Sequence, residues 1–82
     1  MSSSEIVLDE LIRITGTDEV RQNPDLALYD EDVLDSLGTV ELIVALGERL
    51  KIEISPAQIN RQMWATPNKI ISYIDERIKS SS

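Results

Sequence analysis

The residues of this chain that could do chemistry are hydroxyls and carboxylates, because its 82 residues include no histidine and no cysteine. Without histidine there is no usual general base and no Ser–His triad. Without cysteine there is no disulfide, thiolate metal site or thiol nucleophile. The carboxylate run Asp30–Glu31–Asp32 lacks the ligand spacing and the central glycine of an EF-hand calcium loop. We therefore expect a chain that catalyses no reaction and holds no metal ion.

Ser36 is the hydroxyl best placed for chemistry, because it follows an acidic stretch and opens an amphipathic segment. Asp35 and Ser36 are both residues that helix starts favour. A phosphate ester on Ser36 would meet exposed backbone N–H groups and the positive end of the helix dipole. Nothing in the chain could activate Ser36 as a nucleophile, so another enzyme would have to modify it. The simpler interpretation is that Ser36 is only a cap or first-turn residue.

The net charge of −7 belongs to one part of the chain. No lysine or arginine lies between Arg21 and Arg49, whereas seven acids do. These acids are Asp25, Asp30, Glu31, Asp32, Asp35, Glu41 and Glu48. Because nucleic acids and anionic membranes repel such a surface, we expect neither as a partner and favour basic protein surfaces. A plain solvated acidic face is the alternative.

Four helices, three longer and one short, are expected to position these residues in an all-α bundle. Apolar side chains recur at spacings of three and four, and residues typical of helix ends separate the segments. The predicted ranges are residues 4–15, 35 or 36 to 50, a short segment opened by 55–58, and 67–79. The expected end signals are a Ser2–Glu5 capping box, Gly16, a second capping box from Ser55 to Gln58, and Thr66–Pro67.

A long connection separates the first two predicted helices, and loops of this length are often functional. Asn23–Pro24–Asp25 predicts a turn, and Leu26, Leu28 and Tyr29 are expected to pack onto the core. Further along, residues 52–54 are expected to be extended without a partner strand. Trp64 is expected to pack in the core or against a loop, and Gly47 is expected to allow close approach of a neighbouring segment.

One domain spanning residues 1–82 is expected, ordered over about 4–79 and frayed at both serine-rich ends. The N-terminus lacks the basic region and long apolar run of a signal peptide, which predicts a cytoplasmic protein. No stretch approaches the roughly 18 apolar residues that a membrane span requires, so no membrane insertion is expected.

The second predicted helix has two apolar faces. Stepping about 100° per residue places Thr39, Leu42, Ile43, Leu46 and Leu50 on a side that we assign to the core. A second set lies roughly opposite and consists of Leu37, Glu41, Val44 and Glu48, with Val40 towards its edge. An apolar stripe flanked by carboxylates predicts a docking surface for a partner with an apolar groove and a basic rim. The alternative is that this set packs under the long loop.

Asp35–Ser36–Leu37 at the start of a helix in a small acidic chain resembles the phosphopantetheine-dependent carrier superfamily. The longer string Leu-Asp-Ser-Leu-Gly-Thr-Val-Glu-Leu over residues 34–42 is similar to the D-alanyl carrier family of teichoic acid D-alanylation. The segments Gln-Asn-Pro-Asp at 22–25 and Trp-Ala-Thr-Pro-Asn at 64–68 agree, so the resemblance covers nearly the whole chain. It implies an acyl-carrier-protein-like four-helix bundle.

The resemblance also implies a function. A phosphopantetheinyl transferase would attach a 4′-phosphopantetheine arm to Ser36, and Asp35 would help to position that serine. A D-alanine–carrier ligase would load D-alanine onto the arm's thiol as a thioester, and a membrane-bound O-acyltransferase system would use it to esterify (lipo)teichoic acid of the cell wall. The outer set of the second helix would meet these partners: Leu37, Val40, Glu41, Val44 and Glu48. The carrier is expected to be a non-catalytic monomer, and a phosphoprotein by virtue of the attached arm.

Two departures from the family pattern leave alternatives open. Leu37 stands where the D-alanyl carriers often have Phe or Met, and Met63 stands where Val is expected. Gly38, however, replaces the acidic residue usual in fatty-acid carriers. The alternatives are another acyl, peptidyl or aminoacyl carrier, or an unmodified helical adaptor.

Overall fold

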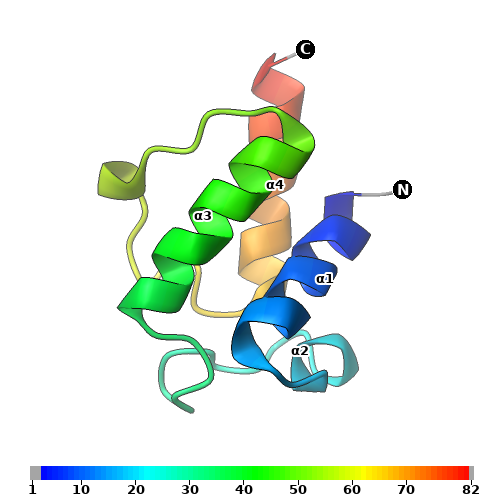
Figure 1. Ribbon diagram of the computed structural model, residues 1–82, viewed down its shortest axis with the longest axis vertical. Helices are drawn as coiled ribbons and strands as arrows, with labels where there is room; N and C mark the ends of the chain where they lie inside the picture. Colours follow the sequence, from blue (N-terminus) through cyan, green and yellow to red (C-terminus); the bar gives the residue numbers. More distant parts are fainter. Residues whose placement is uncertain (1–2, 82) are drawn as a thin grey trace.

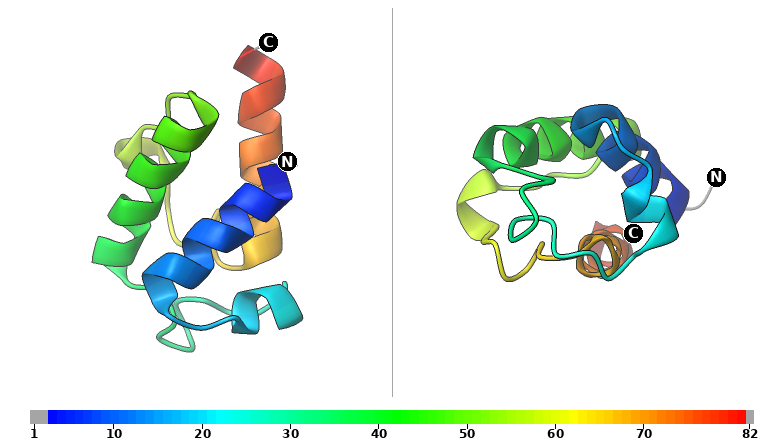
Figure 2. Two further views of the ribbon diagram at one scale, coloured as in Figure 1. Left: turned by 45° about the vertical axis from the view of Figure 1, so that its right-hand side comes forward. Right: turned by 90° about the horizontal axis from the view of Figure 1, so that it is seen from below.

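The computed structural model describes residues 3–81, which form four α-helices and one 3₁₀ turn and contain no strand (Figure 1). The helices are α1 (Ser3–Thr15), α2 (Glu19–Gln22), α3 (Ser36–Leu50) and α4 (Pro67–Ser81), and the 3₁₀ turn is Pro56–Gln58. Seen from below, α1, α3 and α4 surround a common centre (Figure 2). The predicted all-α class with three longer helices is confirmed.

Local end signals determine where the longer helices begin and end. Gly16 takes a left-handed φ of 76° and donates its N–H to the carbonyl of Ile12 at 2.8 Å, which ends α1. Thr66 accepts the N–H of Lys69 at 3.2 Å through its hydroxyl, and Pro67 opens α4. These boundaries were predicted from the sequence. The expected Ser2–Glu5 box involves Ser2, which lies outside the described residues.

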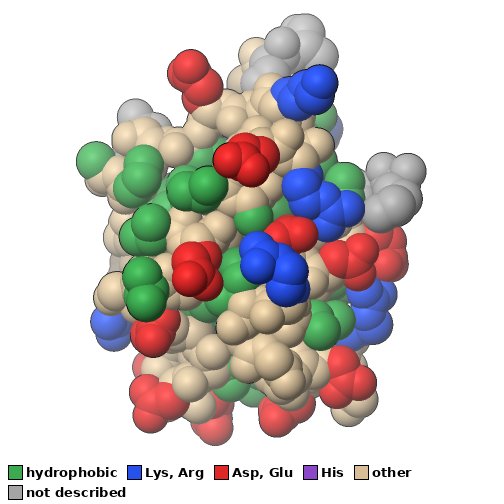
Figure 3. Space-filling view, viewed as in Figure 1, with side chains coloured by type: hydrophobic (Ala, Val, Ile, Leu, Met, Phe, Trp, Pro, Cys, Tyr) green, Lys and Arg blue, Asp and Glu red, His purple; other side chains and the backbone are tan. Residues whose placement is uncertain are grey.

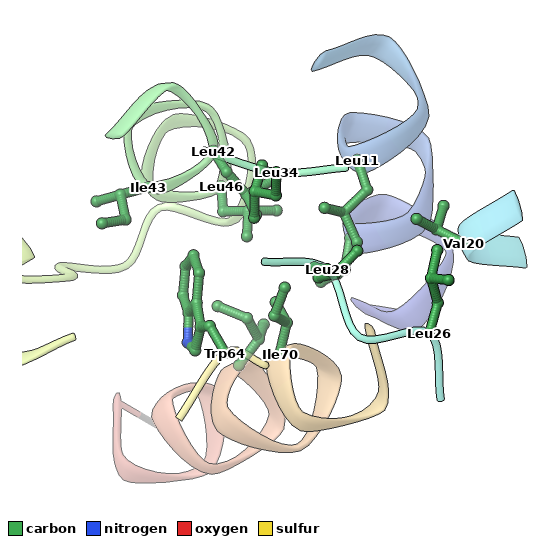
Figure 4. Close-up of a cluster of buried hydrophobic side chains, with 12 residues drawn as sticks. Leu11, Val20, Leu26, Leu28, Leu34, Leu42, Ile43, Leu46, Trp64 and Ile70 are labelled. Atoms are coloured by element: carbon green, nitrogen blue, oxygen red, sulfur yellow. The ribbon is translucent and has the colours of Figure 1, made fainter. Parts of the chain in front are cut away.

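The core lies between the three longer helices and is entirely aliphatic except for one tryptophan (Figure 4). Leu42 and Leu46 of α3 face Leu11 of α1 and Ile70 of α4, and all four are fully buried. Trp64 is also fully buried, as predicted, and its ring packs edge-to-face with that of Tyr73, with the ring centroids 5.8 Å apart.

The connection from α1 to α3 is held by hydrogen bonds to the chain just before α4 and to the first turn of α4. Leu28 is fully buried and donates its N–H to the carbonyl of Ala65 at 2.9 Å, and Asn68 donates to the carbonyl of Pro24 at 3.0 Å. The predicted turn at Asn23 is present, because the carbonyl of Asn23 accepts the N–H of Leu26. Burial of Leu26 and Leu28 and half-burial of Tyr29 confirm that this loop packs on the core.

Two short elements differ from the prediction. The connection contains α2, which the sequence did not predict because four residues are too few for a helical repeat. Conversely, the predicted short third helix is a single 3₁₀ turn, and the Ser55 side chain makes no capping hydrogen bond. The segment 52–54 belongs to none of the helices, and the described residues contain no strand with which it could pair. Gly47 does permit close approach, because a Cβ there would lie 3.2 Å from the carbonyl oxygen of Ile52.

Glu10 joins α1 to α3 through an ion-pair network that the sequence did not reveal. Its carboxylate is nearly buried and accepts hydrogen bonds from Arg13 at 2.7 Å and from Arg49 at 2.9 Å. Burial alone would raise the pKa of Glu10, but the hydrogen bonds and positive charges of the two arginines outweigh it and lower the pKa.

We expect Glu10→Gln to lower the free energy of unfolding at pH 7 by about 1–2 kcal/mol, because hydrogen bonds to a charged group are lost while both arginines keep partial access to water. The native pKa is below the unfolded one, so the contribution of Glu10 is present above about pH 4.3 and is lost as the pH falls through the native pKa. Urea unfolding of both proteins at pH 7 and pH 3 measures this. A stability difference of equal size at both values would contradict it, and Glu76→Gln, an exposed carboxylate, is the control.

Candidate functional site

Ser36 is the first residue of α3 and is exposed to solvent. Asp35 is the N-cap: its backbone is extended, and its carboxylate accepts the N–H of Gly38 at 2.7 Å. This cap leaves the N–H groups of Ser36 and Leu37 without an intrahelical acceptor at the positive end of the helix. The predicted Asp35–Ser36 helix start is therefore confirmed as a local structure, and an anionic group on Ser36 is electrostatically compatible with it.

Thr39 and Tyr29 stabilise the first turn of α3 through hydrogen bonds. Neither residue was assigned a role at this site from the sequence. The Thr39 hydroxyl donates to the carbonyl of Asp35 at 2.8 Å. Because a hydroxyl has one hydrogen, the Tyr29 hydroxyl is the donor in its 2.7 Å contact with Thr39. The guanidinium of Arg61 lies over the Tyr29 ring, 5.2 Å from its centroid. The loop before α3 and the segment before α4 thus meet beside Ser36.

Gly38 fills a position where the fold leaves no space for a side chain. A Cβ there would lie 2.9 Å from Cδ1 of Leu34, 3.1 Å from the Asp35 carboxylate and 3.3 Å from Cγ2 of Ile14. Any larger residue would press on the buried Leu34 and on the capping carboxylate. The glycine therefore allows α1, the loop and the capped end of α3 to pack together.

An open hollow of about 160 Å³ lies beside Ser36. Its other lining residues are Tyr29, Thr39, Ile59, Asn60 and Arg61. The Ser36 hydroxyl is exposed and makes no hydrogen bond to any residue within 3–81. An exposed hydroxyl, two open N–H groups and an adjacent hollow with a cationic side chain are compatible with a covalently attached phosphate ester.

The outer set predicted for α3 is exposed along the whole helix. Leu37, Val40 and Val44 have exposed fractions of 69%, 47% and 54%, and Glu41 and Glu48 are exposed beside them. The alternative that these apolar residues pack under the long loop is therefore wrong. We call these five residues the α3 outer face. Figure 3 shows apolar side chains running along α3 with acidic side chains next to them, and further acids around the loop below.

Within residues 3–81, none of the helices combines the length and the apolar character that a membrane crossing needs.

Comparison with known proteins extends over nearly the whole chain. A family model described as the phosphopantetheine attachment site matches residues 5–74. The D-alanyl carrier protein of Listeria monocytogenes serotype 4a is 44% identical over 75 residues, covering 92% of this chain and 96% of that protein. Its counterpart in Enterococcus faecalis is 43% identical over the same shares, and that of Bacillus subtilis is 38% identical over 93% of this chain and 97% of its own.

Proposed function

The chain belongs to the phosphopantetheine attachment-site family, and we propose that it is a D-alanyl carrier with Ser36 as the attachment residue. The observation that carries this proposal is the exposed Ser36 hydroxyl at the capped start of α3, inside the matched segment. Similarity to D-alanyl carrier proteins over 92–93% of the chain supports D-alanine as the cargo.

The residues around Ser36 suit attachment better than catalysis. When bound, 4′-phosphopantetheine supplies the terminal thiol that this cysteine-free chain lacks, and that thiol holds an acyl or aminoacyl group as a thioester. Ser36 supplies the oxygen of attachment, and the open N–H groups of Ser36 and Leu37 offer hydrogen bonds to a phosphate. Asp35 holds this end of the helix in place through Gly38. The chain itself acts as a non-catalytic carrier.

The α3 outer face is the surface that we assign to partner enzymes. Its exposed leucine and valines suit an apolar groove, and Glu41 and Glu48 suit a basic rim. The partners proposed are a phosphopantetheinyl transferase, a D-alanine–carrier ligase and a membrane-bound O-acyltransferase system that D-alanylates teichoic acid. A cytoplasmic monomer would meet the first two in solution.

Stepwise mass measurement tests the function. Incubation with coenzyme A and a phosphopantetheinyl transferase should add the mass of one arm, and subsequent incubation with ATP, D-alanine and a D-alanine–carrier ligase should add one alanyl group. Malonyl transfer to the same protein is the comparison. Uptake of malonyl but not D-alanine would replace D-alanine carriage by another acyl carrier function, and absence of the first mass gain would overturn the carrier role altogether.

A further inference from the structure

We propose that Arg61 binds the phosphate of the group attached to Ser36, as a positioning residue for the arm. This inference rests on the proposed function and extends it to a residue 25 positions away in the sequence. The observation behind it is that Arg61 and Ser36 line the same hollow beside the start of α3. Three further features support it: the unused N–H donors of Arg61, its contact with the Tyr29 ring, and the acidic residues of the surrounding segment.

First, Arg61 has an unused hydrogen-bonding capacity. Arg13, Arg21 and Arg49 each donate to carboxylates, and Arg77 donates to the carbonyl of Glu53. Arg61 alone among the arginines, within the chain that the structure describes, forms no hydrogen bond or ion pair. An exposed guanidinium has five N–H donors in a plane, an arrangement that matches the oxygens of a phosphate.

Second, Arg61 is held in position without using those donors. Its Cζ atom lies 5.2 Å from the centroid of the Tyr29 ring, so a cation–π contact fixes the group while its in-plane N–H groups stay available. Tyr29 is in turn tied by its hydroxyl to Thr39, in the first turn of the helix that begins at Ser36. A second hollow of about 220 Å³ is also lined by Tyr29 and Arg61, which leaves the arginine room to adjust.

Third, a phosphate on Ser36 would lie in an acidic part of the chain, where a nearby cation would stabilise it. A phosphodiester on Ser36 adds a negative charge to a part of the chain that has seven acids and no base between residues 22 and 48. Repulsion from these carboxylates would disfavour the attached form, and a guanidinium in the adjoining hollow would offset it. The Ser36 and Leu37 N–H groups and Arg61 would then contact the phosphate from two sides.

Melting temperatures of the unmodified and arm-bearing proteins test this assignment in wild type, Arg61→Gln and Lys51→Gln. Lys51 is an exposed base at the opposite end of α3, so its variant removes the same charge away from Ser36. The cation–π contact with Tyr29 is present in both forms of wild type and missing from both forms of Arg61→Gln, so the difference between the two forms of each protein isolates the effect of the phosphate. Mass spectrometry first verifies that each protein carries one arm.

We expect the change in melting temperature on arm attachment to be about 2–5 °C less favourable in Arg61→Gln than in wild type, and unchanged in Lys51→Gln. This difference between Arg61→Gln and wild type should become smaller in 1 M NaCl, where the Debye length is about 3 Å. In ¹⁵N-labelled protein, the side-chain Nε–H signal of Arg61 should move on attachment while that of Arg49 stays in place.

Equal changes in melting temperature in wild type and Arg61→Gln would overturn the assignment, as would an equal loss in Lys51→Gln. Both results leave the carrier function intact, because the arm has been attached. Failure of wild type to gain an arm would instead overturn the carrier function, and the role of Arg61 with it.

Discussion

Ser36→Ala is expected to abolish attachment of the arm, so that incubation with coenzyme A and a phosphopantetheinyl transferase adds no mass to the protein. The substitution removes the oxygen that would carry the phosphate. No other serine combines an exposed hydroxyl with a carboxylate-capped helix start and an adjoining hollow in the residues that the structure describes. The loss should therefore be complete rather than partial.

The same substitution should leave the fold intact, which makes the loss interpretable. Ser36 is exposed, and the cap of α3 is provided by Asp35 rather than by the Ser36 side chain. We expect the free energy of unfolding to change by no more than about 0.5 kcal/mol, as for other surface substitutions. Urea unfolding followed by circular dichroism checks this value.

Ser55→Ala is the matched control, because Ser55 is exposed at the start of the 3₁₀ turn and its side chain makes no capping hydrogen bond. This variant should gain one arm as fully as wild type does. An undiminished mass gain in Ser36→Ala would show that the arm is attached elsewhere and would refute the assignment of Ser36.

The double variant Glu41→Lys with Glu48→Lys is expected to reduce the rate of D-alanine loading by about 10- to 100-fold at low salt. Both carboxylates are exposed on the α3 outer face beside Val40 and Val44. Reversing them replaces attraction to a basic rim by repulsion, which acts mainly on the association rate. The effect should shrink as added salt screens the charges.

Loading is measured as kcat/KM of a D-alanine–carrier ligase on protein that has first been converted completely to the arm-bearing form. Circular dichroism should show unchanged helicity, because neither glutamate is buried. The control is Glu19→Lys with Glu76→Lys, which makes the same change in net charge on α2 and α4. Loading at the wild-type rate at both low and high salt would contradict the assignment of the α3 outer face.

Features that depend on neighbouring residues were predictable from the sequence. The start of α3 at Asp35–Ser36, the end of α1 at Gly16 and the start of α4 at Thr66–Pro67 each involve contacts that span three or four residues. The division of α3 into a buried and an exposed face follows from the helical repeat alone, since Leu42 and Leu46 are buried while Val40 and Val44 are not. Helix capping and helical periodicity depend only on residues a few positions apart, so both can be predicted from the sequence alone.

Features that depend on distant residues required the tertiary structure. Glu10 meets Arg49 across 39 positions, and Arg61 meets Tyr29 and the hollow of Ser36 only because two loops fold against each other. The short α2 and the 3₁₀ turn were misjudged because segments of three or four residues have weak local preferences, which packing overrides. The position of Ser36 was therefore readable from its immediate neighbours, whereas the side chains that surround it come from parts of the chain that only the closed bundle brings together.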